Sequence, residues 1–123
     1  IMAGKIVADT LEHSTAGSVD TQYVVDGSAK HWVHFNGQGT IAIYTGGSLN
    51  TSSLTDNGTG NYDVFTTNNF SGADNNFVSG NSSGNQTRTF PQASNEYMLN
   101  LQQSNGTAED RADVGGVWFG ELA

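Results

Sequence analysis

Residues 31–44 read His-Trp-Val-His-Phe-Asn-Gly-Gln-Gly-Thr-Ile-Ala-Ile-Tyr, or HWVHFNGQGTIAIY. Successive side chains of a β-strand point to opposite faces, so every second residue from His31 shares one face and Trp32 and His34 share the other. Asn36–Gly39 supplies residues that tolerate the positive φ angles of a tight turn. Residues 40–45, TIAIYT, then form a return strand. The stretch predicts a β-hairpin.

The rest of the chain continues this pattern of short alternating runs separated by turn residues. Apolar residues nowhere recur at helical spacing over three turns. Turn signals recur about every 8–12 residues, which is typical of an antiparallel sandwich or barrel. Further strands are expected at Lys5–Asp9, Gln22–Asp26, Asn61–Thr66, Asn75–Ser79, Gln86–Phe90, Asn95–Gln102 and Gly116–Glu121. Residues 12–18 read as an exposed connector, and Ser48–Leu54 alternates apolar and polar residues.

These patterns predict an all-β protein. We expect an antiparallel, jelly-roll-like β-sandwich of about 8–10 strands. Residues 1–20 would form a short extended N-terminal arm that docks to another protein, and residues 21–123 a single β-sandwich domain.

Composition excludes several classes of function. The 123 residues carry twelve acids, four bases and a formal net charge of −8, which repels phosphate backbones and argues against nucleic acid as a partner. There is no cysteine, and no apolar run approaches the roughly 20 residues of a membrane span. Only 35% of the residues are hydrophobic. A core this thin must be filled by aromatic side chains or completed by another subunit.

No motif points to catalysis or to a bound metal. His31 and His34 are three residues apart on a predicted strand, so they face opposite sides and cannot share an ion. Asp56–Asp63 faintly resembles a calcium loop but lacks the spacing and terminal Glu of an EF-hand, and turn chemistry explains its composition. Glu109–Asp113 reads as a solvated loop with a local ion pair around Arg111. We therefore expect no catalytic residue, metal or cofactor.

Other residues are candidates for binding and packing. Polar side chains suited to ligand contacts gather in two predicted loops, 79–88 and 104–110. The candidate receptor contacts are Asn81, Asn85, Arg88, Asn105 and Asp110. Trp32, Tyr44, Tyr62, Phe77, Tyr97 and Trp118 could stack on sugar rings if exposed, but in so thin a core most of them must be buried. The predicted core or oligomer contacts are Trp32, Val33, Phe35, Ile41, Ile43, Tyr62, Val64 and Trp118. Docking of the arm is assigned to Lys5, Ile6 and Val7.

The order of residues from Val24 to Thr67 resembles a known protein module. The matching elements are Gly27-Ser-Ala-Lys30, Trp32-Val33, Phe35-Asn-Gly37, Gly39-Thr40 and Thr55-Asp-Asn-Gly-Thr-Gly60. They are similar to a module of bacteriophage tail-fibre-like proteins, notably from phages of marine bacteria and cyanobacteria. His31 and His34 stand where that module usually has Ala and Asn. The resemblance implies a β-rich virion protein, usually trimeric, and brings no catalytic residues.

The expected function follows from this resemblance. The chain would be a homotrimeric virion structural protein of the tail-fibre or knob type, attached to other virion proteins through its arm, with polar loops that meet host-surface glycans. A capsid decoration protein is the first alternative, and a non-viral carbohydrate-binding module is the second. A small hydrolase would require a pair of clustered acids, and the sequence singles out no such pair.

Overall fold

The computed structural model describes residues 4–73, 76–82, 86–103 and 105–123. Its elements in chain order are β1 (Thr10–His13), β2 (Gly17–Asp20), α1 (Thr21–Gly27), β3 (His31–Asn36), β4 (Ala42–Leu49), β5 (Thr51–Asp56), β6 (Asn61–Thr66), β7 (Asn76–Ser82), β8 (Gln86–Ala93), β9 (Glu96–Gln102) and β10 (Val114–Gly120). The predicted all-β fold is confirmed, because the only helix of the described chain is the seven-residue α1.

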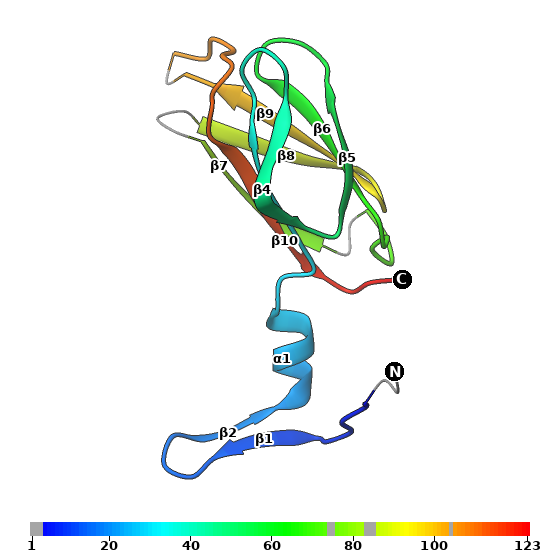
Figure 1. The fold of residues 1–123 in the computed structure, drawn as a ribbon. Helices are drawn as coiled ribbons and strands as arrows, with labels where there is room; N and C mark the ends of the chain where they lie inside the picture. Colours follow the sequence, from blue (N-terminus) through cyan, green and yellow to red (C-terminus); the bar gives the residue numbers. More distant parts are fainter. Residues whose placement is uncertain (1–3, 74–75, 83–85, 104) are drawn as a thin grey trace.

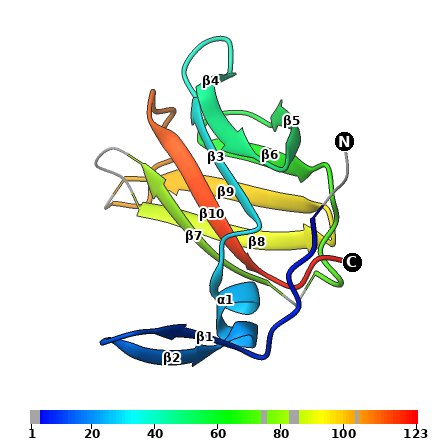
Figure 2. The same ribbon diagram turned by 60° about the horizontal axis from the view of Figure 1, so that its bottom comes forward.

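Eight of the strands form two four-stranded antiparallel sheets, ordered β4-β3-β10-β7 and β5-β6-β9-β8 (Figures 1 and 2). Buried side chains of both sheets form one shared core, so the sheets pack face to face as a sandwich. The hairpin pairs β3–β4, β5–β6 and β8–β9 each stay within one sheet. The strand order therefore combines hairpins within each sheet with crossings between the sheets, for example from β4 to β5, which refines the jelly-roll-like expectation.

The predicted hairpin is present, with Phe35 opposite Ile43 and Asn36 opposite Ala42. The Asn36 side chain holds the turn, since its Oδ1 accepts from the Gln38 amide at 3.1 Å and its Nδ2 donates to the Gln38 carbonyl at 3.0 Å. Burial along β3 alternates as predicted. The return strand continues to Leu49, beyond its expected end, because a register shift opposite Val33–Phe35 lets the chain pass through two glycines.

Asn50 carries the chain from one sheet to the other. It has a positive φ of 60°, a conformation that asparagine tolerates better than most residues. Its side chain bonds both backbone groups of Asn68, accepting from the amide at 2.7 Å and donating to the carbonyl at 3.0 Å. The alternating run at 48–54 is therefore divided between β4 and β5.

Aromatic rings dominate the core. Trp118, Tyr62, Tyr97 and Phe35 are all fully buried, and aliphatic side chains fill the space between them. The Trp118 ring lies over Gly116, where an added Cβ would come within 2.5 Å of it. Glycine at this position therefore makes room for the largest side chain of the core.

The eight predicted core or oligomer residues divide between two environments. Val33, Phe35, Tyr62, Val64 and Trp118 lie in the core, and Ile41 packs against it. Trp32 is half-buried on the outer face, and Ile43 is 36% exposed.

The N-terminal region differs from expectation. Residues 22–26 belong to helix α1, so the strand predicted there is wrong. A five-residue alternating pattern is too short to separate strand from helix, and Gln22 bonds Asp26 at the i,i+4 spacing of a helix. The expected strand at 5–9 is irregular backbone, and residues 12–18 contribute to the β1–β2 hairpin rather than a simple connector. The predicted arm, residues 1–20, thus contains the β1–β2 hairpin, and helix α1 follows it where the sandwich was expected to begin.

The packing of the hairpin yields a stability prediction. Phe35 is fully buried and meets the Tyr62 ring edge-on at 5.3 Å, so Phe35→Ala should lower the free energy of unfolding by about 3–5 kcal/mol. Ile43 lies directly opposite Phe35 but is 36% exposed, so Ile43→Ala should cost about 1 kcal/mol or less. Urea unfolding followed by tryptophan fluorescence measures both. Equal losses would contradict the assignment of Phe35 to the core.

Candidate functional site

Two surfaces at opposite ends of the sandwich are candidates for function. The N-terminal module, residues 4–28, projects from one end (Figure 1). The other, distal end carries the turns at 37–41 and 57–60 and the loop at 105–113. The antiparallel strands impose this division, because each hairpin turn at the distal end returns the chain toward the module.

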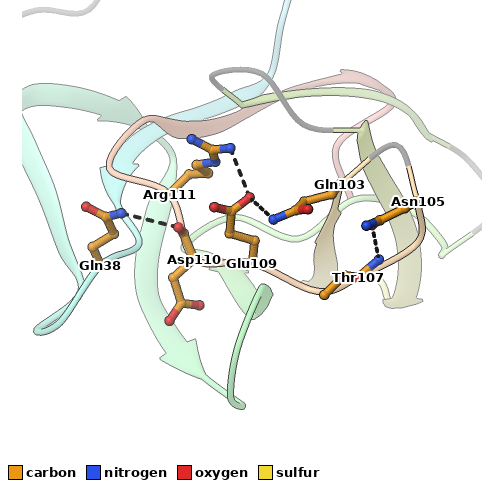
Figure 3. A network of polar contacts seen from close by, with 7 residues as sticks. All are labelled: Gln38, Gln103, Asn105, Thr107, Glu109, Asp110 and Arg111. Atoms are coloured by element: carbon orange, nitrogen blue, oxygen red, sulfur yellow. Dashed lines mark hydrogen bonds and ion pairs between the residues drawn. The ribbon is translucent and has the colours of Figure 1, made fainter.

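Asp110 ties the distal turns together. Its Oδ1 accepts a hydrogen bond from the Gly60 amide at 2.6 Å and lies 2.8 Å from the Tyr62 hydroxyl. Its backbone carbonyl accepts from the Gln38 side chain at 3.3 Å (Figure 3). The sequence placed Asp110 among the receptor contacts, whereas in the fold one of its carboxylate oxygens serves the architecture of the loops. A carboxylate oxygen can accept hydrogen bonds from the Gly60 amide and the Tyr62 hydroxyl at the same time.

The Tyr62 hydroxyl links Asp110 to a second distal turn. It is also 2.6 Å from the Gly37 carbonyl, so its single proton lies between two acceptors. Burial, followed by the hydrogen bond to Asp110 and the nearby negative charges, raises the pKa of Tyr62 well above its ordinary value. The phenol therefore stays protonated and remains a donor.

A second group of contacts orders the surface of this distal loop. Glu109 Oε2 accepts from Arg111 Nη2 at 2.9 Å and from Gln103 Nε2 at 3.0 Å (Figure 3). Asn105 is exposed, and its Oδ1 accepts from the Thr107 amide at 3.0 Å. These bonds hold polar side chains in fixed positions. Binding of a ligand would therefore cost less side-chain entropy.

The remaining predicted receptor contacts are more dispersed. Arg88 is exposed on β8, opposite Asn100. Asn81 lies in β7, where the structure describes backbone alone, and Asn85 lies outside the described residues. The structure therefore joins Asn105 and Asp110 in one loop and leaves Arg88 on a strand.

The two acids of the calcium-like stretch are engaged in local bonds. Asp56 Oδ1 accepts from the Gly58 amide at 2.9 Å. Asp63 is buried, and its two oxygens accept from Asn57 at 2.6 Å and from Gln92 at 3.0 Å. Within the described ranges, no group of three or more His, Asp and Glu side chains is close enough to hold a metal ion.

The two histidines of the hairpin face opposite sides of their sheet. His31 is fully buried, stacks on Trp118 at 4.2 Å and lies 2.9 Å from the Thr51 hydroxyl. Desolvation lowers the pKa of His31 to about 4, so the ring is neutral at neutral pH. His34 lies on the outer surface, 3.2 Å from Asp113.

Few aromatic rings are available for stacking on sugars. Tyr62, Tyr97 and Trp118 are fully buried. Tyr44 is 38% exposed and lies beside His34, with ring centroids 4.6 Å apart. Its hydroxyl donates to the Ala112 carbonyl at 2.7 Å. Phe77 belongs to β7, where the backbone alone is described.

The N-terminal module has no buried residue among those described. Several of its apolar side chains are strongly exposed, including Ile6 at 91% and Tyr23 at 71%. A groove of about 460 Å³ crosses the module and is lined by Lys5, Ile6, Val7, Ala8, Leu11, Thr21, Val24 and Val25. The residues that the sequence assigned to docking thus line this groove. Sequence reasoning missed the contribution of Val24 and Val25, because it placed them on a strand of the sandwich.

Comparisons with known proteins bring no relative: no family model, curated protein or solved structure matches this chain. None of the described helical segments has the length and apolar character needed to cross a membrane. The arrangement of polar and apolar surfaces therefore carries the functional proposal.

The role of Asp110 is testable by substitution. Asp110→Ala should lower the free energy of unfolding by about 1.5–3 kcal/mol, because it removes a charged acceptor and leaves the Gly60 amide without its partner. Asp113→Ala is the matched control, since that side chain is 60% exposed and its loss should cost less than about 1 kcal/mol. Chemical denaturation compares the two variants. An Asp110→Ala variant that loses no more stability than Asp113→Ala would contradict the structural role of Asp110.

Burial of His31 predicts a pH dependence of stability. The unfolded ring titrates near 6.5 and the folded ring near 4, so between these values the unfolded state binds more protons. The free energy of unfolding should therefore fall as the pH drops from 6.5 to 4. Protonation of His31 in the unfolded state should account for about 3 kcal/mol of this loss. Denaturant titrations at several pH values should show this loss reduced in His31→Gln and retained in His34→Gln. An unchanged slope in His31→Gln would refute the assignment.

Proposed function

We propose that this protein is a structural protein of a bacteriophage virion, a tail-fibre-like knob displayed on the particle surface. Its N-terminal module attaches it to another virion protein, and its distal loops point outward. The observation that carries the proposal is the module of residues 4–28, which contains a hairpin and a helix and exposes apolar side chains but has no buried residue. Large exposed apolar surfaces mark interaction sites.

The sequence supports the viral assignment. The residues shared with tail-fibre-like modules extend from Gly27 to Gly60 and include the β3–β4 hairpin and the turn before β6. The internal bonding of the distal loops fits a surface that must keep its shape outside a cell without disulfides. Ordered polar side chains such as Asn105 also suit weak contacts with host glycans, which many copies on one particle would strengthen.

The body of the protein would assemble as a homotrimer. β4 is an outer strand of its sheet and carries Ile43, Tyr44 and Leu49, which are 36%, 38% and 48% exposed. Association of three copies along this edge would cover both the apolar side chains and the unpaired backbone of the strand.

Particle composition and oligomeric state test this proposal. Quantitative mass spectrometry of purified particles of the virus that encodes the chain should detect it at a fixed copy number divisible by three. Light scattering after size-exclusion chromatography should give a trimer for the full chain, and Leu49→Asp should reduce that trimer because it places a charge at the β4 edge.

Different outcomes would reject different parts of the proposal. Absence of the chain from purified particles would refute the virion role. A monomer that is absent from particles and binds defined glycans would instead identify a carbohydrate-binding module. Density for the chain on the capsid rather than the tail would replace the tail-fibre assignment with that of a capsid decoration protein.

A further inference from the structure

The distal end of the sandwich carries the same reactive dipeptide in three places. Asparagine is followed by glycine at Asn36–Gly37, Asn57–Gly58 and Asn105–Gly106. The first two pairs lie at the distal turns and the third lies in the distal loop (Figure 1). Asparagine is chemically labile, and glycine has no side chain to shield its amide nitrogen. The sequence thus makes each pair a candidate site of deamidation.

Deamidation begins when the glycine amide nitrogen attacks the asparagine Cγ. A bond from this nitrogen to Cγ closes a five-membered succinimide, the Cγ–Nδ2 bond breaks, and Nδ2 leaves as ammonia with the proton of the glycine amide. Water then opens the ring, giving aspartate if it attacks Cγ and isoaspartate if it attacks the backbone carbonyl carbon. The net reaction consumes one water and releases one ammonia. Because ring closure requires rotation of both groups, bonds that hold either of them oppose it.

The pair Asn36–Gly37 is held on every side. The Gly37 amide donates to the Arg111 carbonyl at 2.8 Å, and the Gly37 carbonyl accepts from the Tyr62 hydroxyl at 2.6 Å. Gly37 is buried, and an added Cβ would come within 2.7 Å of the Tyr62 oxygen, so its backbone has no room to turn. The Asn36 side chain bonds both backbone groups of Gln38. This pair is therefore protected by packing and by hydrogen bonds.

The pair Asn57–Gly58 is held through the nitrogen that would leave. Asn57 Nδ2 donates to Oδ2 of the buried Asp63 at 2.6 Å. The Gly58 amide donates to Asp56 Oδ1 at 2.9 Å, and the Asn57 amide donates to the Asn61 carbonyl at 2.9 Å. Loss of ammonia would take a donor from a buried carboxylate, and the product would place a second carboxylate against it. Both effects oppose reaction at Asn57.

The pair Asn105–Gly106 is exposed and held by local bonds. The Gly106 amide donates to the Gln103 carbonyl at 2.9 Å, within one turn. Asn105 accepts from the Thr107 amide through Oδ1 at 3.0 Å, a contact that does not involve the leaving nitrogen (Figure 3). No described atom lies within 4 Å of a Cβ added at Gly106. Exposed turns of this kind open at a small cost in free energy, so ring closure is least hindered here.

We propose that Asn105–Gly106 is a site of spontaneous deamidation, and that the fold protects Asn36 and Asn57. Conversion of Asn105 adds one negative charge to the formal −8 of the chain. It also replaces an amide, which donates, by a carboxylate that only accepts. The contact chemistry of the distal loop therefore changes as the protein ages. The reaction is a property of the folded chain and does not depend on the virion role.

Peptide mapping by mass spectrometry tests the proposal on the full chain. Cleavage after Lys and Arg gives one peptide, 31–88, that holds Asn36 and Asn57, and another, 89–111, that holds Asn105. During warm incubation at mildly alkaline pH, with tryptophan fluorescence verifying the folded state, Asn105 should convert at least fivefold faster than either of the others. Fragmentation assigns the change to a residue. Asn105→Gln should abolish the conversion at this position, because the longer side chain closes the ring poorly.

The same incubation in urea is the matched control for the fold. The three pairs should then convert at similar rates, because the unfolded chain leaves only the shared dipeptide to decide. Conversion of Asn36 or Asn57 as fast as Asn105 in the folded chain would overturn the proposal. A preference for Asn105 that persists unchanged in urea would also overturn it, as would an Asn105 that converts in urea and stays intact in the folded chain.

Substitutions that imitate the product test the difference between two of the sites. Asn57→Asp should lower the urea midpoint of unfolding, because it sets a carboxylate against Asp63. Asn105→Asp should leave the midpoint unchanged, because its carboxylate can still accept from the Thr107 amide. Equal losses in the two variants would overturn the claim that the contact with Asp63 distinguishes these sites.

Discussion

The packing of Trp118 between the two sheets is the interaction on which the sandwich depends. Trp118 lies opposite His31 on neighbouring strands, and their rings stack at 4.2 Å. Tyr97 reaches them from the other sheet, with its ring centroid 5.4 Å from that of Trp118. In a chain with only 35% hydrophobic residues, a few large rings must supply most of the buried apolar area. Gly116 is part of the same constraint, since the indole occupies the space that a Cβ would need.

The two ends of the sandwich are stabilised in different ways. At the distal end, the turns and the loop are held by polar bonds, several of them to Asp110 and Glu109. At the other end, the N-terminal module keeps its hairpin and helix without a buried residue of its own. A two-stranded hairpin is at best marginally stable alone in water. Among the described residues, the module is therefore the part with the least burial of its own side chains.

Exposed apolar side chains lie both on the N-terminal module and at the β4 edge of the sandwich. The exposed side chains at the edge, Ile43, Tyr44 and Leu49, sit on an outer strand with backbone available for pairing. The groove of the module is lined mainly by apolar side chains, and Lys5 is the charged residue of its lining.

The sequence alone determined the all-β class, the hairpin about Asn36–Gly39 and the inward face of β3, because a two-residue period and turn-forming residues are local properties. Tertiary structure decided what local pattern could not. Residues 22–26 became a helix, with Thr21 bonded to the 5–9 segment, although their alternation also fits a strand. Asp110 became the link between turns, because its donors come from residues about 50 positions away along the chain. Such long-range pairing depends on how the two sheets stack, and no short window of residues encodes that arrangement.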